Sequence, residues 1–549
     1  MAQGPQWWRD AVIYQVYIRS FADGTGDGVG DIAGIRSRLP YLRDLGVDAI
    51  WITPWYPSPM NDGGYDVADY RDIAAEFGTL ASADALIRDA HALGIRVIID
   101  IVPNHTSHRH RWFAAAVAAG PGSRERARYL FRPGRGPSGD LPPNNWRSLF
   151  GGPGWTRVTE RDGTPGEWYL HLFDVTQPDL DWSNRDVRDE FVDVLRFWFD
   201  RGIDGFRIDV AHGLVKDPAL PDLVYADNGE PFAVGHPPGH HPYNDRDGLR
   251  EIYREWRTVA DSYDGDRIFV AEAWVDTPDR LAPYVSPGQL HSAFDFAYLQ
   301  APWSGPKLRA IIDSSRRTIG SVGAHNTWVL SNHDVERHLT RFGRKMTAGS
   351  LLEDPPADPA QVDLALGTRR ARAAVMLTLA LPGGAYLYQG EELGLPQVLD
   401  LPESALRDPI WKRSGHTRRG RDGCRVPIPW TVRGPSVGFG VNGSWLPQPP
   451  GWGDYSVLAQ RNDSDSMLEH YRRLLRMRRE LPALGEGELH WLSPAGADVL
   501  AFSREPEFAC VVNLGSVPIE LPDHSRVLVT SVPLVDGQLP TDAAAWLAT

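Results

Sequence analysis

Apolar residues recur along the chain in one repeated order: a helical stripe, a glycine, and then a continuous apolar run. This order occurs three times. The glycine that ends the helical stripe and the apolar run after it are Gly46 and 47–53, Gly94 and 95–102, and Gly202 and 203–209. Glycine just past a helix supplies the left-handed cap that ends it. Apolar runs that alternate with helices are typical of a parallel sheet covered on both faces.

Five further strand candidates complete the set: 12–18, 267–271, 292–298, 327–331 and 385–389. Eight strands that alternate with helices match the number and order of a (β/α)8 TIM barrel. The helix before the fourth strand is predicted to begin at Ser183, because Asp186 three residues later completes a pattern like a capping box. We therefore predict the α/β fold class, with a TIM barrel as the main domain.

Two segments depart from this pattern. The stretch between the third and fourth strands is rich in Gly, Pro, Asn and Trp, and it is too long for a structureless loop. After the last long helical stretch, 467–481, short alternating apolar runs indicate an antiparallel β domain. The predicted domains are, in chain order, the first part of the barrel, an inserted subdomain after the third strand, the second part of the barrel and a C-terminal β-sandwich: 1–104, 105–175, 176–483 and 484–549.

Composition and charge exclude several classes of protein. Of the 549 residues, 42% are hydrophobic and 23% are charged, which excludes a disordered or fibrous chain. A net charge of −14 argues against nucleic acid or an anionic membrane as a partner, because both bind clustered Lys and Arg. Two cysteines cannot build a disulfide framework. No apolar run is long enough to span a membrane and the start lacks the layout of a signal peptide, so we expect a cytoplasmic location.

We also expect a monomer or a weak homodimer.

Polar residues follow the predicted strands at one end of the barrel, where the catalytic groups of such barrels lie. These strand ends carry 100–105, Arg207 with Asp209, Glu272, and 332–334. Several acids at successive strand ends indicate an active site at this mouth of the barrel.

The chemistry of two of these acids differs because their neighbours differ. Arg207 and Asp209 are two residues apart, so on a strand they point to the same side. The guanidinium favours an ionised carboxylate, as a nucleophile requires, whereas the apolar neighbours of Glu272 favour the uncharged acid. One ionised and one protonated carboxyl group are what a retaining glycosidase uses, and a structural ion pair is the alternative for either residue alone.

These motifs resemble the four signature regions of the α-amylase superfamily of glycoside hydrolases. The matching segments are 100–105, 205–209, Glu272 and 332–334. Two further segments, 177–182 and 421–427, are most similar to the α-glucosidase and oligo-1,6-glucosidase branch, which usually has Asn where this chain has Asp181. The resemblance covers nearly the whole chain.

The resemblance implies a role for each residue at the predicted mouth of the barrel. The catalytic set is Asp209 as the nucleophile, Glu272 as the acid/base, and Asp334 as the third carboxylate, which binds the 2- and 3-hydroxyls of the sugar. The expected sugar-binding residues beside them are Arg207, which orients the nucleophile, and the histidines His105 and His333.

The same resemblance implies a closed pocket for the chain end of the sugar. Tyr65 is expected to stack beneath the first sugar ring, and Asp66 with Arg425 to bind its 4-hydroxyl. Such a pair leaves no room for a further sugar, so the enzyme is expected to cut only from the non-reducing end. Phe150 is expected either to wall the leaving-group side or to be an ordinary core residue of the inserted subdomain.

A glycine-rich segment after the first strand carries acidic residues at alternate positions. It does not match the dinucleotide-binding fingerprint, so no organic cofactor is expected. The spacing instead resembles an EF-hand-like loop for a hard cation, Ca²⁺ or Mg²⁺, with a structural role. The predicted ligands are Asp23, Thr25, Asp27, Val29 and Asp31. A glycine-rich turn without metal is the alternative.

The sequence thus predicts an exo-acting retaining α-glucosidase for short α-gluco-oligosaccharides, with α-1,4 linkages slightly favoured and α-1,6 linkages as the alternative. Val210 is the kind of residue that accompanies α-1,6 activity in this branch, but 211–213 depart from the oligo-1,6-glucosidase pattern. A transglucosylase or a sucrose- or trehalose-type isomerase with the same covalent intermediate stays open. A non-catalytic barrel scaffold is the remote alternative, because this chain has a complete set of acids and no membrane anchor.

Overall fold

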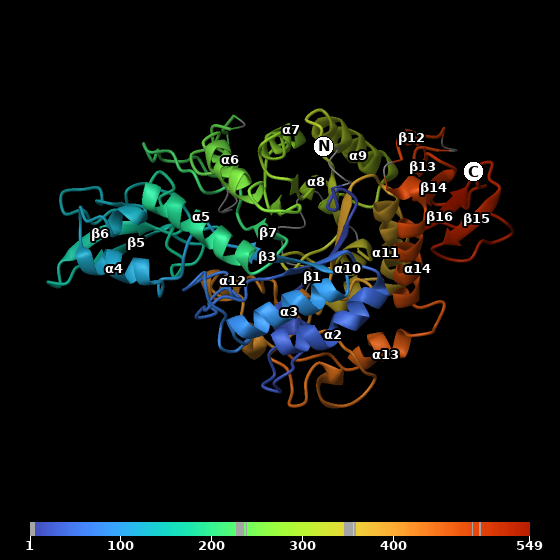
Figure 1. The fold of residues 1–549 in the computed structure, drawn as a ribbon, viewed down its shortest axis with the longest axis horizontal. Helices are drawn as coiled ribbons and strands as arrows, with labels where there is room; N and C mark the ends of the chain where they lie inside the picture. Colours follow the sequence, from blue (N-terminus) through green and yellow to red (C-terminus); the bar gives the residue numbers. More distant parts are fainter. Residues whose placement is uncertain are drawn as a thin grey trace.

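The molecule has three parts arranged in a row (Figure 1). The inserted subdomain lies at one end, the barrel in the middle and a C-terminal sheet at the other end. The structure, a computed structural model, describes residues 6–226, 235–237, 239–344, 355, 358–485, 487–493 and 496–549.

The barrel has eight parallel strands, as predicted. They are β1 (Val12–Val16), β2 (Ala49–Ile52), β3 (Arg96–Ile101), β7 (Gly205–Ile208), β8 (Ile268–Ala271), β9 (Ser292–Ala293), β10 (Thr327–Val329) and β11 (Gly384–Tyr388). They pair in the order β10-β11-β1-β2-β3-β7-β8-β9. A parallel bridge between Phe294 and Thr327 joins the two ends of this sheet, so the barrel closes. The TIM-barrel prediction is confirmed.

Strand β9 is much shorter than predicted. The apolar run suggested a strand over 292–298, but the chain turns into the short helix α8 (Phe296–Leu299) instead. Asp295 causes this turn, because its side chain accepts a hydrogen bond from the Tyr298 backbone and caps the new helix.

Long helices cover the outside of the barrel. They are α2 (Ile32–Leu45), α3 (Leu80–Ala92), α5 (Arg185–Asp200), α6 (Leu249–Ala260), α9 (Gly305–Gly320), α11 (Leu364–Ala380) and α14 (Met467–Glu480). Gly46 ends α2 in the left-handed conformation, with φ at 100°, as its position after the apolar stripe predicts. The predicted start of α5 is off by one residue, because the Asn184 side chain, and not Ser183, accepts the capping bond from the Asp186 backbone.

Shorter helices lie in the connections between these elements. They are α1 (Ile18–Phe21), α7 (Pro278–Leu281), α10 (His338–Phe342), α12 (Pro409–Arg413) and α13 (Val457–Gln460). The connections that follow β8 and β11 thus contain short helices, α7 after β8 and α12 and α13 after β11.

The inserted segment folds as a small subdomain after β3. Its elements are α4 (Arg111–Ala119), β4 (Phe131–Arg132), β5 (Trp155–Thr159) and β6 (Pro165–Leu170). The three strands form an antiparallel sheet in the order β4-β6-β5. An isolated bridge between His105 and Asp179 joins the two connections that link the subdomain to the barrel. This bridge keeps the subdomain next to the strand ends.

The C-terminal part is a single antiparallel sheet. Its strands are β12 (Leu489–Trp491), β13 (Val499–Arg504), β14 (Phe508–Asn513), β15 (Arg526–Thr530) and β16 (Ala543–Ala548), in the order β12-β13-β14-β16-β15. The described residues contain no second facing sheet of the predicted β-sandwich. One face packs on α11, which is buried almost throughout 371–380, and irregular chain that includes Ile519 and Leu539 covers the other face. A helix thus supplies the apolar cover that a second sheet would give.

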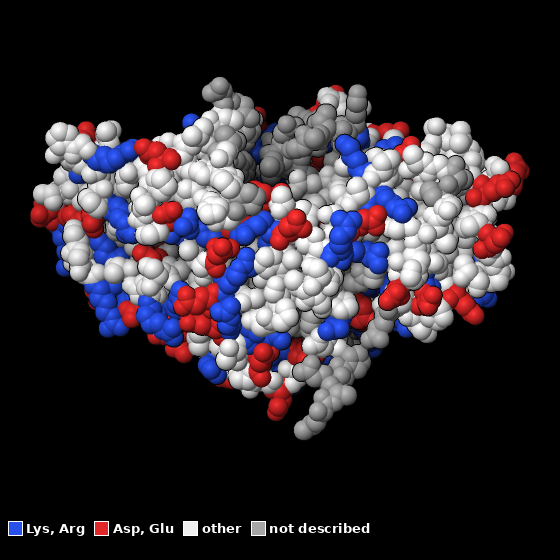
Figure 2. Space-filling model, turned by 90° about the horizontal axis from the view of Figure 1, so that it is seen from above, with Lys and Arg blue, Asp and Glu red and all other residues white. Residues whose placement is uncertain are grey.

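Charges of both signs are interspersed on the face shown in Figure 2 and do not gather into a patch of one sign. Within the described residues, no helix combines the length and the apolarity that crossing a membrane requires.

Replacing Trp546 with alanine is expected to destabilise the C-terminal sheet. The indole is fully buried, its Nε1 donates to the Met376 carbonyl of α11 at 3.1 Å, and the ring packs edge-on against Phe508. Truncating a buried tryptophan costs about 3–5 kcal/mol. Guanidinium unfolding followed by circular dichroism should show this loss. Val535→Ala, at an exposed site of the same sheet region, should change the free energy of unfolding by less than about 0.5 kcal/mol.

Candidate active site

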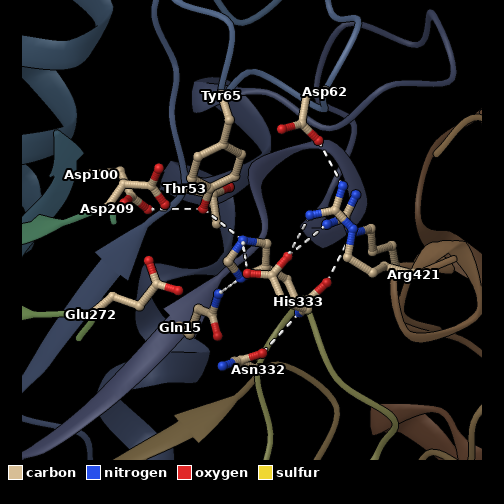
Figure 3. A network of polar contacts seen from close by, with 12 residues as sticks. Gln15, Thr53, Asp62, Tyr65, Asp100, Asp209, Glu272, Asn332, His333 and Arg421 are labelled. Atoms are coloured by element: carbon tan, nitrogen blue, oxygen red, sulfur yellow. Dashed lines mark hydrogen bonds and ion pairs between the residues drawn. The ribbon is translucent and has the colours of Figure 1, made fainter. Parts of the chain in front are cut away.

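The predicted catalytic residues meet at the carboxyl ends of the barrel strands (Figure 3). Asp100 lies in β3 and Arg207 in β7, and Asp209 directly follows β7. Glu272 directly follows β8, and Asp334 follows β10 after a short loop. Because the strands are parallel, these ends lie at one mouth of the barrel, so residues far apart in sequence become neighbours.

A single buried guanidinium holds three of the acids. Nη1 of Arg207 lies 2.7 Å from Oδ1 of Asp100 and 2.6 Å from Oδ1 of Asp209, and Nη2 lies 3.1 Å from Oε2 of Glu272. Only 1% of the Arg207 side chain is exposed. The predicted pairing of Arg207 with Asp209 is therefore present, and the same guanidinium also contacts Glu272.

Three carboxyl groups around one guanidinium favour the retention of a proton. Burial raises the pKa of Asp209, and Arg207 opposes this rise at 2.6 Å. Burial likewise raises the pKa of Asp100 to about 6, against the opposing effect of Arg207. The cluster would carry an excess of two negative charges with every acid ionised, so it binds a proton near neutral pH more readily than isolated carboxylates do.

Asp334 has the opposite environment. Burial raises its pKa, but His333, Arg421 and Arg425 together lower it more, so that the pKa lies well below its usual range. Its Oδ1 accepts from both arginines, at 3.0 Å from Arg421 and 2.9 Å from Arg425. Asp334 is therefore a stable anion beside the proton-holding cluster.

His333 lies between Asp334 and Asp100. Its Nε2 is 3.3 Å from Oδ2 of Asp334, and hydrogen bonds through Tyr65 lead to Asp100. Gln15 Nε2 lies 2.6 Å from Nδ1 of His333, and the Tyr65 hydroxyl lies 2.6 Å from its Nε2. Because the Gln15 amide donates, Nδ1 is the acceptor and Nε2 carries the proton. The Tyr65 hydroxyl then donates to Asp100 Oδ2 at 3.2 Å. Burial lowers the pKa of His333, so the ring is neutral in this chain.

The histidine and aromatic residues expected around the sugar also lie here. Tyr65 stacks on His333 with ring centroids 5.3 Å apart and an angle of 11°. His105 is buried, its Nε2 lies 3.1 Å from the Tyr65 carbonyl, and burial lowers its pKa to about 4. Phe150 lies against the Arg421 guanidinium, 5.2 Å from ring centroid to carbon, and is only 7% exposed. Phe150 thus extends from the inserted subdomain to the site.

The structure does not bring Asp66 and Arg425 together. Both oxygens of Asp66 are used inside its own loop, where they accept bonds from the Ser58 hydroxyl at 2.7 Å and from the backbone of Asn61 and Asp62 at 3.0 and 3.2 Å. The side chain is fully buried and shapes the turn. Its expected partner, Arg425, instead contacts Asp334.

A second buried acid–arginine pair lies beside Asp334. Asp62 Oδ1 lies 2.7 Å from Nη2 of Arg421, and Asp62 is 4% exposed. The same guanidinium lies 2.6 Å from Asp408 Oδ2 and 3.0 Å from Asp334 Oδ1. Gln177 Nε2 donates to the remaining Asp62 oxygen at 3.0 Å. The sequence interpretation missed Asp62, Asp408 and the role of Arg421, although Arg421 opens the segment that carries the resemblance.

The glycine-rich loop is organised by its own hydrogen bonds. Asp23 accepts from the backbone of Gly26 and Gly28, and Asp31 accepts from the backbone of Gly24, Thr25 and Gly34. Asp27 accepts from the Val29 backbone at 2.9 Å. No group of three or more His, Cys, Asp or Glu side chains in the described parts of the chain is arranged to hold a metal ion. A Ca²⁺ or Mg²⁺ ion at this loop stays a prediction.

The chain belongs to the α-amylase family, because residues 15–487 match the family described as alpha amylase, catalytic domain. It is a glycoside hydrolase and, more narrowly, a glucosidase of this family. It is 37% identical over 518 residues to a probable alpha-glucosidase of Rhizobium meliloti (strain 1021), covering 91% of this chain and 87% of the relative. It is 34% identical to an oligo-1,6-glucosidase of Parageobacillus thermoglucosidasius, covering 94% and 92%.

Solved structures give the same family and a further similarity. The alpha-glucosyl transfer enzyme XgtA superimposes with a TM-score of 0.85 and 36% identity, over 99% of both chains. An isomaltulose synthase of Erwinia rhapontici NX5, solved as a mutant in complex with sucrose, superimposes with a TM-score of 0.83 and 29% identity, over 99% of both chains.

If the loop over 23–31 binds a structural cation, chelation should lower thermal stability and leave catalysis intact. A ligand that binds only the folded state stabilises it by RT ln(1 + [L]/Kd), so its removal lowers the melting temperature. Scanning calorimetry with and without EDTA, followed by addition of Ca²⁺ or Mg²⁺, measures this change. An unchanged melting temperature together with an absence of bound metal in elemental analysis would show that the loop is a turn without metal.

Proposed function

We propose that this protein is an exo-acting retaining α-glucosidase, which releases glucose from the non-reducing end of short α-gluco-oligosaccharides. Asp209 is the nucleophile, Glu272 the acid/base, and Asp334 the carboxylate that binds the sugar hydroxyls. The observation that carries the proposal is the Arg207 guanidinium, which contacts both Asp209 and Glu272 and therefore holds the two acids beside one space at the mouth of the barrel.

The proposed reaction has two steps with one covalent intermediate. In the first step Glu272 donates its proton to the glycosidic oxygen while Asp209 attacks the anomeric carbon, so the C–O bond to the leaving group breaks and a glucosyl ester forms. In the second step Glu272 removes a proton from water, which displaces Asp209 and restores both groups. Two inversions give net retention. Asp334, held as an anion by two arginines, stabilises positive charge on the sugar ring in both transition states.

The proposed chain-end specificity rests on Asp62 and Arg421 in place of Asp66 and Arg425. The Asp62–Arg421 pair lies in a buried network that includes Asp334, the predicted partner of the sugar hydroxyls. A carboxylate and a guanidinium both bind hydroxyl groups through charge-assisted bonds. With Phe150 packed over Arg421, the network supports a pocket that ends at the terminal glucose.

Two aspects of the reaction stay open between related alternatives. Transfer of the glucosyl group to a sugar, as in a transglucosylase or a sucrose isomerase, uses the same acids, and the similarity to an alpha-glucosyl transfer enzyme and an isomaltulose synthase favours testing it. Product analysis at high substrate concentration separates transfer from hydrolysis. A panel of maltose, isomaltose, sucrose and trehalose assigns the linkage, with α-1,4 slightly favoured from the sequence. The cytoplasmic location and the monomeric or weakly dimeric state stay predictions.

Variants of the two catalytic acids should lose different steps. Asp209→Ala should lose nearly all turnover with every substrate, because no covalent intermediate can form. Glu272→Gln should lose most activity on maltose but retain the first step with aryl glucosides that have good leaving groups, because those need no protonation. We expect a carboxyl separation of about 5–5.5 Å and the initial release of α-glucose, seen by NMR. Initial release of β-glucose would contradict retention.

Asp62→Ala should weaken recognition of the chain end much more than a nearby surface change. The variant removes the proposed carboxylate partner of the sugar hydroxyl, and a hydrogen bond to a charged group contributes about 1.5–3 kcal/mol. Because Asp408 and Asp334 still contact Arg421 and keep it in place, we expect about a 100-fold loss in kcat/KM for maltose. Asp69→Ala, at an exposed site of the same loop, should leave kcat/KM unchanged.

The same pocket predicts the order in which products appear. Maltotriose should give maltose and glucose, galactosides should be poor substrates, and starch should be attacked slowly from its ends. A rapid fall in iodine staining with little glucose formed would show internal cleavage and contradict a closed pocket.

A further inference from the structure

Trp274 contacts Glu272, the proposed acid/base. Neither the sequence motifs nor the proposed roles assign a function to Trp274. Its indole Nε1 donates a hydrogen bond of 3.0 Å to Oε1 of Glu272. The residue lies two positions after Glu272, on the loop that leaves β8, and is half-buried. Its ring stacks on Phe296 of α8 with centroids 4.1 Å apart and an angle of 24°. The stack fixes the plane of the indole, and therefore the direction of its N–H group.

We propose that Trp274 is a positioning residue that sets which oxygen of Glu272 carries the catalytic proton and how readily that proton leaves. This inference rests on the proposed role of Glu272 as the acid/base. It concerns a group that acts through Glu272, and it assigns no contact between Trp274 and the sugar.

The two oxygens of Glu272 have different environments. Oε2 accepts from the Val210 backbone at 2.8 Å and is paired with the guanidinium of Arg207, whose Nη2 lies 3.1 Å away. Oε1 accepts only the indole N–H of Trp274 among the described residues. The cation beside Oε2 disfavours a proton on that oxygen, whereas Oε1 keeps a free lone-pair position and has no cation beside it among the described residues. The proton is therefore carried on Oε1, and the indole directs it to the other side of that oxygen.

The backbone donor to Oε2 is fixed as firmly as the indole. Val210 has φ at 47°, in the left-handed region that a β-branched residue rarely adopts. The Val210 N–H donates to Oε2 of Glu272 at 2.8 Å, directly after the end of β7. With one rigid donor on each oxygen, the carboxyl plane of Glu272 cannot rotate without breaking a bond.

The indole also affects the strength of the acid. A hydrogen bond donated to a carboxylate stabilises the ionised form, so Trp274 eases the departure of the proton in the first step. The charged and titratable groups that face Glu272 are Arg207 and Asp209 from β7 and its end, Asp100 from β3, and His212, whose Nδ1 lies 3.4 Å from the Glu272 carbonyl. Trp274 differs from all of these because it can be removed as a donor without changing any charge.

Trp274→Phe tests the proposal, because it keeps an aromatic ring beside Phe296 and removes the N–H donor together with part of the indole ring. Without this donor, the acid should hold its proton to higher pH, so the alkaline limb of kcat/KM should move up by about one pH unit. On maltose kcat should fall about tenfold with KM within twofold of the wild type. The first step with an aryl glucoside that has a good leaving group should keep its rate.

Trp491→Phe is the matched control. Its indole donates to Asp313 Oδ1 at 2.6 Å, so the same chemical bond is deleted far from the site, and the pH profile should not move.

An unshifted alkaline limb in Trp274→Phe, or an equal loss for good and poor leaving groups with a raised KM, would overturn the proposal. If Glu272→Gln leaves activity on maltose intact, the assignment of the acid/base itself fails. If Glu272→Gln loses that activity and only the pH shift is missing, the role of Trp274 alone fails.

Discussion

The site depends on one buried guanidinium. Arg207 is almost completely shielded from water and contacts Asp100, Asp209 and Glu272. Carboxylates this close repel one another, and burial strengthens the repulsion because little water screens it. Without the arginine, the acids would have to separate or take up protons. With it, they lie together, as a two-step reaction with one nucleophile and one acid would need.

A second ionic network lies beside the first and keeps Asp334 ionised. Arg421 contacts Asp62, Asp334 and Asp408, and Arg425 contacts Asp334 as well. Two arginines contact Asp334 and keep its pKa below the usual range. Burial instead raises the pKa of Asp209, which contacts one guanidinium. The difference between these two acids follows the number of arginines that contact each.

The parts outside the barrel act by positioning loops. The inserted subdomain supplies Phe150, which packs on Arg421, and the chain that returns from it supplies Gln177, which donates to Asp62. Trp274 and Phe296 come from the connections on either side of β9 and meet in a stack beside Glu272. The barrel strands therefore determine the positions of the charged groups, whereas the loops determine the orientation of each group. Orientation by loops agrees with the variety of reactions that this fold supports.

The sequence by itself predicted the barrel, the order of its strands and the acids that meet at its mouth. It did so because strands buried on both faces give continuous apolar runs, and because polar residues at the ends of parallel strands must meet at one mouth. It did not determine the end of β9, where one side chain, Asp295, turns a strand-like run into a helix. Nor did it distinguish a sandwich from a sheet that packs on α11, since both bury one face of each strand.

Only the tertiary structure decided which acid pairs with which arginine. Asp62 and Asp66 lie in one loop and are equally polar, so the sequence offers no means to tell which side chain closes the turn and which contacts Arg421. The Asp62–Arg421 bond joins residues 359 positions apart, and its partner is set by the packing of a late loop against an early one. The hydrogen bond from Trp274 to Glu272 likewise depends on a ring plane that Phe296 fixes from another connection. Local pattern encodes elements and their order, but the direction of a side chain in a loop follows from contacts that form only when distant segments pack together.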